Sequence, residues 1–127
     1  MSDHRTALGR VRGLGSAKEG VAHWWMQRVT ALLLIPLVIW FVAALLAHMG
    51  ADYAGVIAWL HQPLTYGLMV VLLGAVFWHA TLGLQVVIED YVQGEAAKLA
   101  LILLAKGACL GLFMAGFVAL SKIAFAG

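Results

Sequence analysis

A lone histidine inside a long apolar stretch is the first residue of this sequence that could do chemistry. His79 lies in the uncharged stretch 64–88, which ends abruptly at Glu89, Asp90 and Tyr91. Placing an imidazole in apolar surroundings costs free energy unless a partner binds it. A histidine in such a stretch is therefore a candidate functional residue, and its partner has to be identified.

The residue spacing around His79 favours a flat ligand on one side of the helix. Asp90 follows His79 by eleven residues, or three turns at about 3.6 residues per turn, so both lie on one face about 16 Å apart. Ala75 and Gly83, one turn away on either side, are small and predict an open groove beside the imidazole, wide enough for a macrocycle. Haem iron is a frequent partner of such a histidine. A simple hydrogen bond to a neighbouring helix remains the alternative.

The overall composition identifies the solvent in which these residues must be positioned. The chain has 127 residues, of which 64% are hydrophobic and 11% charged, and its mean hydropathy is +0.96. A soluble domain of this size could not bury so much apolar surface. The net charge of +2 is not that of a nucleic-acid-binding protein. Cys109 is the single cysteine, so the chain has neither a disulfide framework nor a paired-cysteine metal site.

Three apolar stretches are long enough to cross a bilayer, at about 24–49, 64–89 and 98–123. Backbone groups in lipid must be paired internally, so these spans are expected to be helices. The prediction is an all-α membrane protein with an arm at 1–22 and a three-helix anchor domain at 23–127. Pro36 is expected to kink the first span, and Pro63 to begin the second.

The distribution of basic residues predicts the orientation of the spans. The loop 50–62 has no Lys or Arg, whereas the segment before the first span is basic. Because positive residues stay in the cytoplasm, the N-terminus and the loop 89–98 should face it, and the C-terminus should lie outside. Trp24 and Trp25 at one end and Trp59 at the other fit interfacial aromatic belts. The basic residues on the predicted cytoplasmic side are Arg5, Arg10, Arg12, Lys18, Arg28 and Lys98.

The third span carries two features of its own. Small residues recur every four positions and would let another helix approach closely, either within this chain or from another subunit. They are Gly107, Gly111, Ala115 and Ala119. Lys106 interrupts the span; we expect it to extend toward the cytoplasmic interface, the alternative being an anionic partner such as a lipid headgroup or a haem propionate.

Two segments of the chain resemble a known family. The segments "GVAHWWMQRVTALLL" and "WHATLGLQVVIEDYV" resemble the smaller membrane-anchor subunit of bacterial succinate dehydrogenase, respiratory complex II. The most specific element is a histidine followed, after ten residues, by Asp-Tyr. The resemblance implies that His79 is an axial ligand of haem b, shared with the partner anchor subunit. It also implies that Asp90 and Tyr91 help form the ubiquinone site, with Arg28 near the haem propionate and quinone region.

The same resemblance implies a function within a larger assembly. The chain would be a multi-pass protein of the cell inner membrane, contributing to a helical bundle with a second anchor (cytochrome b) subunit. A flavoprotein and an iron–sulfur subunit would oxidise succinate, linking the tricarboxylic acid cycle to the respiratory chain, because this chain has no residues that could do so alone. The alternatives are a haemless structural anchor and the anchor of a related fumarate reductase.

Overall fold

The computed structural model describes residues 7–8 and 18–125, and this part of the chain contains helices and no strand. The long helices are α2 (Lys18–His48), α4 (Pro63–Tyr91) and α5 (Glu95–Phe125), each apolar and long enough to cross a membrane. The prediction of an all-α protein with three spans is confirmed. Most of the predicted arm 1–22 lies outside the described residues, as do three of the basic residues behind the orientation, Arg5, Arg10 and Arg12.

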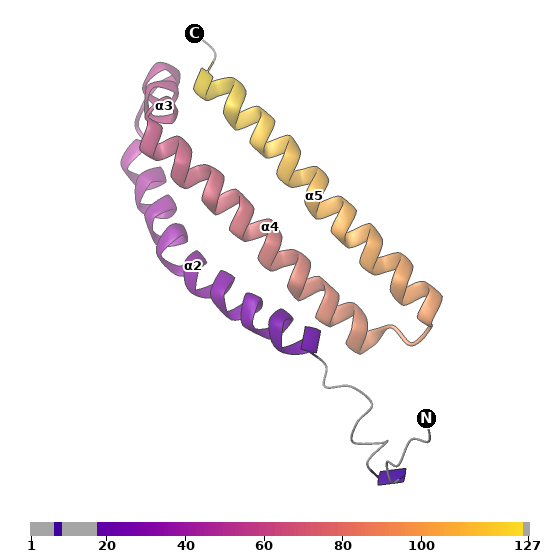
Figure 1. The fold of residues 1–127 in the computed structure, drawn as a ribbon. Coiled ribbons are helices and arrows are strands. Elements are labelled where there is room, and N and C mark those ends of the chain that lie inside the picture. The colour runs from indigo at the N-terminus through magenta and orange to yellow at the C-terminus, as the bar shows by residue number, and fades with distance from the viewer. Residues whose placement is uncertain (1–6, 9–17, 126–127) are drawn as a thin grey trace, which may run out of the picture.

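Helix α4 lies between α2 and α5 and packs against both (Figure 1). Short connections make successive long helices run in opposite directions, so α2 begins where α4 ends and α5 begins (Figure 1). We call this the N-terminal end of the bundle. The positive-inside argument predicts that this end faces the cytoplasm.

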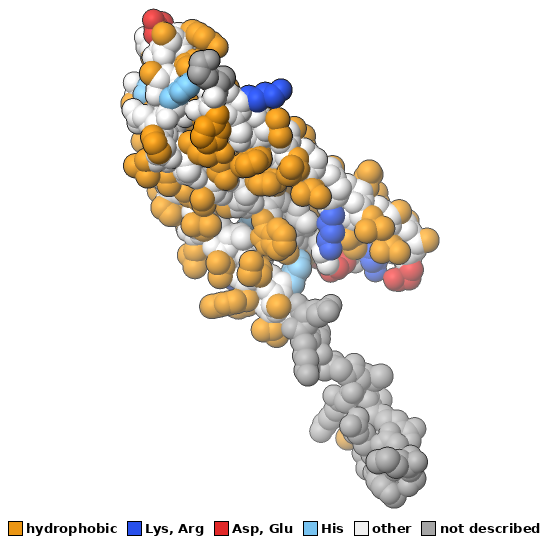
Figure 2. All heavy atoms as spheres, turned by 45° about the horizontal axis from the view of Figure 1, so that its top comes forward, with side chains coloured by type: hydrophobic (Ala, Val, Ile, Leu, Met, Phe, Trp, Pro, Cys, Tyr) orange, Lys and Arg blue, Asp and Glu red, His pale blue; other side chains and the backbone are white. Residues whose placement is uncertain are grey.

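The apolar side chains of the bundle point mostly outward. Its buried core is a small cluster of Leu37, Leu72 and Ala75 between α2 and α4, with three half-buried apolar neighbours around it. Figure 2 shows apolar side chains covering the flank of the molecule and acidic side chains gathered at its ends. Lipid tails are as apolar as leucine, so this arrangement is stable in a bilayer and would not be in water.

A short helix, α3 (Tyr53–Leu60), occupies the stretch that the sequence predicted to be a loop. Asp52 caps it by accepting a hydrogen bond from the Gly55 backbone N–H at 2.8 Å. Trp59 is only 9% exposed and stacks on His48, with 4.5 Å between ring centroids. Trp59 therefore secures α3 against the end of α2, and its place in an interfacial belt stays a prediction.

The tight contacts between α4 and α5 lie away from the stripe of small residues. A Cβ on Gly116 would come within 2.9 Å of Leu73, and Phe113 packs over Gly74. Gly107 and Gly111, in contrast, have no atom within 4 Å of a built Cβ, and all four residues of the stripe are exposed. Packing of this stripe within the chain, one of the two alternatives, is thus ruled out in the described structure.

Helix α2 is bowed along its length (Figure 1), and Pro36 lies inside it. A proline within a helix removes one backbone hydrogen bond and bends the axis, which membrane helices tolerate when neighbours compensate. Pro63 is the first residue of α4, where its missing N–H costs nothing. Both prolines take the places that the sequence predicted.

The orientation can be tested with a fusion at the C-terminal end of the chain. Three spans and a cytoplasmic N-terminus place that end outside. A reporter that is active only in the exterior compartment should be active there, and one that works only in the cytoplasm should be silent. Activity of the cytoplasmic reporter alone would contradict the orientation.

Candidate functional site

His79 lies half-buried in α4 on the side that faces α2. Its Nδ1 is 2.9 Å from the hydroxyl oxygen of Thr30, a residue of α2 that is only 6% exposed. The Thr30 hydroxyl in turn donates to the backbone carbonyls of Met26 and Gln27, at 2.8 and 3.1 Å. When the one hydroxyl hydrogen of Thr30 is directed to a carbonyl, Thr30 accepts from His79, and the imidazole proton is then on Nδ1.

The second ring nitrogen of His79 is left as an acceptor. The amide nitrogen of Gln27 lies 3.5 Å from His79 Nε2, a long and weak contact. An amide N–H can only donate, so this neighbour also agrees with a proton on Nδ1 and a lone pair on Nε2. A neutral imidazole in that form is what an iron ligand requires.

The predicted open groove beside His79 does not exist in this chain, because α2 fills it. Ala75 is 7% exposed and belongs to the buried core. A Cβ at Gly83 would lie 3.5 Å from the Gln27 amide nitrogen. The two small residues thus allow α2 to pack closely against α4, as small residues do in membrane bundles.

A polar pocket adjoins this contact toward the N-terminal end of the bundle. Its volume is about 530 Å³, and its polar lining comes from His23 and Gln27 of α2 and Gln85 and Glu89 of α4. Gln85 donates to the Glu89 carboxylate at 2.8 Å. His23 Nε2 and Gln27 Oε1 are buried without a hydrogen-bond partner in the described structure. Buried polar atoms without partners usually mark the place of a water or a ligand group.

Asp90 and Tyr91 form the end of α4 and lie apart from His79. Both are exposed, Tyr91 to 82% of its surface. The described structure gives neither side chain a hydrogen-bond partner within the chain. Their polar groups are therefore available to a ligand or to another subunit at the N-terminal end of the bundle.

Arg28 is exposed on α2 and stacks over Trp24, with its guanidinium carbon 5.1 Å from the ring centroid. Trp24 also borders the polar pocket. Arg28 thus lies near the rim of the pocket, and the described structure shows no salt bridge between it and Asp90.

Three residues of this site were missed in the sequence. His23, Gln27 and Thr30 are spaced four and three positions apart, so they share one face of α2. That spacing of polar residues within an apolar helix was the available signal, and the side chains indeed line the contact with α4.

His79 is the candidate iron ligand, and the described residues contain no cluster of metal ligands. No group of three or more His, Cys, Asp or Glu side chains in the described part of the chain could hold a metal ion. A haem needs at most two axial ligands from protein, so a single histidine with a free Nε2 fits it. For iron to bind, the Gln27 amide has to turn away from His79 Nε2.

The known proteins that are similar to this chain belong to one family. Residues 2–117 match the family model of the succinate dehydrogenase/fumarate reductase transmembrane subunit. A succinate dehydrogenase hydrophobic membrane anchor subunit of Rickettsia bellii is 34% identical over 104 residues, covering 82% of this chain and 83% of that protein. The corresponding subunit of Paracoccus denitrificans is 33% identical over 92 residues, covering 71% of this chain and 70% of that protein. The chain therefore belongs to the family of succinate dehydrogenase hydrophobic membrane anchor subunits, multi-pass proteins that work in complex with other subunits.

Proposed function

We propose that this anchor subunit contributes an axial ligand to haem b and part of the ubiquinone-reduction site, in the inner membrane of a bacterium. The observation that carries the haem assignment is the hydrogen bond between His79 Nδ1 and Thr30 at 2.9 Å. With Thr30 as the acceptor, this bond would orient the ring and leave Nε2 for iron, an arrangement common among metal-bound histidines.

Haem b, when bound, supplies a one-electron carrier within the membrane. The residues of this chain would hold and surround it. His79 would bind the iron through Nε2, and Thr30 would orient the imidazole. The partnerless oxygen of Gln27 lines a polar pocket suited to hydrated groups. Arg28, near the rim, would neutralise a carboxylate of the propionate type.

Tyr91 and Asp90 would form this chain's share of the quinone site. A phenol hydroxyl can donate a hydrogen bond to a quinone carbonyl oxygen, and a neighbouring carboxylate can orient the ring or pass protons from water. Both residues lie at an end of the bundle, where water and soluble subunits are within reach. Their exposure in the single chain is consistent with a site completed by other subunits, namely the second anchor and the iron–sulfur protein.

Two alternatives remain distinguishable from this proposal. A haemless structural anchor would use the Thr30–His79 bond for helix packing alone, and its purified complex would lack haem absorption. A fumarate reductase anchor would have the same absorption and would differ in the preferred direction of turnover. The relatives named above are all succinate dehydrogenase subunits, which favours the succinate-oxidising direction.

The role of Thr30 can be tested with a variant of the same shape. Thr30→Val removes the acceptor of the His79 Nδ1–H and makes the imidazole a weaker electron donor, which destabilises ferric iron. Loss of a hydrogen bond of about 1 kcal/mol corresponds to about 40 mV for a one-electron couple. We expect the haem midpoint potential to rise by that order in a redox titration of the purified complex.

Two further variants separate this effect from general damage. Thr30→Ser keeps the hydroxyl and should leave the potential near that of the wild type. Thr81→Val removes a hydroxyl from α4 that bonds only its own backbone, at 2.7 Å from the Phe77 carbonyl, and should also leave it unchanged. A wild-type potential in Thr30→Val would show that Thr30 does not act on a haem ligand.

A further inference from the structure

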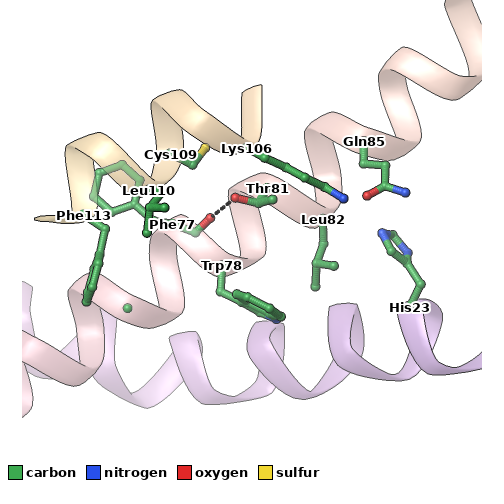
Figure 3. Close-up of a pocket in the computed structure, with 11 residues that line it drawn as sticks. His23, Phe77, Trp78, Thr81, Leu82, Gln85, Lys106, Cys109, Leu110 and Phe113 are labelled. Atoms are coloured by element: carbon green, nitrogen blue, oxygen red, sulfur yellow. Dashed lines mark hydrogen bonds between the residues drawn. The ribbon is translucent and has the colours of Figure 1, made fainter. Parts of the chain in front are cut away.

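A second, mostly apolar hollow lies between α4 and α5 and reaches His23 of α2 at one end. This groove has a volume of about 650 Å³, and its walls include Phe77 of α4 with Leu110 and Phe113 of α5 (Figure 3). Trp78 and Leu110, which also line it, are 53% and 62% exposed. The groove therefore opens to the surface that faces lipid in a single chain.

Polar side chains from three helices converge at one end of this groove. Figure 3 shows Lys106 of α5 extending toward Gln85 of α4, with the imidazole of His23 from α2 beside them. Lys106 has no carboxylate within salt-bridge distance among the described residues. His23 Nε2 is buried and lacks a hydrogen-bond partner. The polar end of the groove thus combines an unneutralised cation with an unused ring nitrogen.

The polar end of the groove lies near the edge of the hydrocarbon core, where the lipid headgroup region begins. Helices α2 and α5 have 31 residues each, about 46 Å, so they exceed a hydrocarbon core of about 30 Å by about 8 Å at either end. His23 lies about 8 Å from the start of α2, and Gln85 about 9 Å from the end of α4. Lys106 begins deeper in α5, and helical side chains lean toward the N-terminus of their helix, which brings its ammonium toward the same level.

We propose that this groove binds one anionic phospholipid. Its phosphate would lie beside Lys106 and His23, and an acyl chain would follow the apolar wall past Phe77 and Phe113. The charge of Lys106 favours this occupant, because an apolar helix from another subunit would leave the ammonium without a counter-charge. The neutral headgroup of a quinone would likewise leave the Lys106 ammonium without a counter-charge. The inference does not depend on haem binding.

The test uses the complete succinate dehydrogenase complex, extracted in mild detergent and stripped of lipid. Phosphatidylglycerol and phosphatidylcholine would be added in separate titrations. Native mass spectrometry would count the lipid molecules bound at each concentration. We expect one phosphatidylglycerol to bind more tightly than phosphatidylcholine. Lys106→Gln should weaken its binding about five- to tenfold, the order expected for one lysine at an anionic lipid. Lys106→Arg should retain it.

Lys122→Gln is the matched control, because Lys122 is an exposed lysine in the last turn of the same helix. It should bind phosphatidylglycerol as the wild type does. Leu110→Trp, which narrows the groove, should weaken both lipids. Equal binding of both lipids to the wild type, unchanged binding to Lys106→Gln, or displacement of phosphatidylglycerol by ubiquinone would overturn the proposal. The haem spectrum of Lys106→Gln should stay that of the wild type, so this outcome is separate from that of the haem assignment.

Discussion

Replacing His79 with leucine should remove the low-spin haem b spectrum from the assembled complex. Leucine has similar bulk and cannot bind iron, so the haem would lose one of its two axial ligands. We expect haem to be absent or to show a high-spin spectrum and a strongly shifted midpoint potential. Reduced-minus-oxidised absorption spectra of the purified complex measure the haem content and spin state, and a redox titration measures the midpoint potential.

His61→Leu is the control for this variant. His61 is an exposed histidine at the opposite end of the bundle, just after α3, so its loss should leave the haem spectrum as it is. Haem could survive in His79→Leu on a substitute ligand, but its spectrum and potential would then change. An unaltered spectrum and potential in His79→Leu would contradict the assignment.

Replacing Tyr91 with phenylalanine should slow quinone reduction while sparing succinate oxidation by an artificial acceptor that bypasses the quinone. The change removes one hydroxyl and little volume, so assembly and haem content should be kept. A polar partner left without its hydrogen bond costs about 1–3 kcal/mol, which corresponds to a loss of about 5- to 150-fold in quinone reduction. Steady-state rates with ubiquinone and with the artificial acceptor, measured on one preparation, provide the comparison.

Tyr53, at the opposite end of the bundle, is a close match for Tyr91. Tyr53 is 83% exposed, against 82% for Tyr91, so Tyr53→Phe should leave both rates unchanged. Asp90→Asn should slow the same step as Tyr91→Phe and alter its dependence on pH if the carboxylate passes protons. Wild-type quinone reduction in both Tyr91→Phe and Asp90→Asn would mean that these residues are only the solvated end of α4.

The spans could be predicted from the sequence because hydropathy and length decide them. A bilayer leaves the backbone of a long apolar stretch no alternative to a helix, so tertiary context cannot override the pattern. Helix α3 is different: its eight residues are too few to cross the membrane, and they fold because Asp52 caps them and Trp59 packs on His48. That packing depends on where α2 ends, which a local pattern does not contain.

The site could be predicted only as far as His79 itself. Small neighbours at Ala75 and Gly83 indicate close approach, but the sequence does not say whether a ligand or a helix approaches. The rotation of α2 against α4 decides this, and it brings Thr30 and Gln27 to the imidazole. The two predicted partners of His79, a neighbouring helix and haem iron, are compatible with each other, since a hydrogen bond to Thr30 at Nδ1 leaves Nε2 for iron.

Lys106 illustrates the same limit. Its reach toward Gln85 (Figure 3) is in the direction expected for a lysine extending toward the interface at the N-terminal end of the bundle. The sequence could not show that the path follows a groove between α4 and α5 or that His23 of α2 lies at its end. These contacts arise from three helices whose relative positions are fixed only by packing.

The most direct test of the account is a cryo-electron microscopy map of the complete complex at side-chain resolution. We expect a haem whose iron lies within bonding distance of His79 Nε2, with His79 Nδ1 still hydrogen-bonded to Thr30 and the Gln27 amide turned away. A haem bound by other residues, iron on Nδ1, or His79 packed against α2 with no haem beside it would contradict the account.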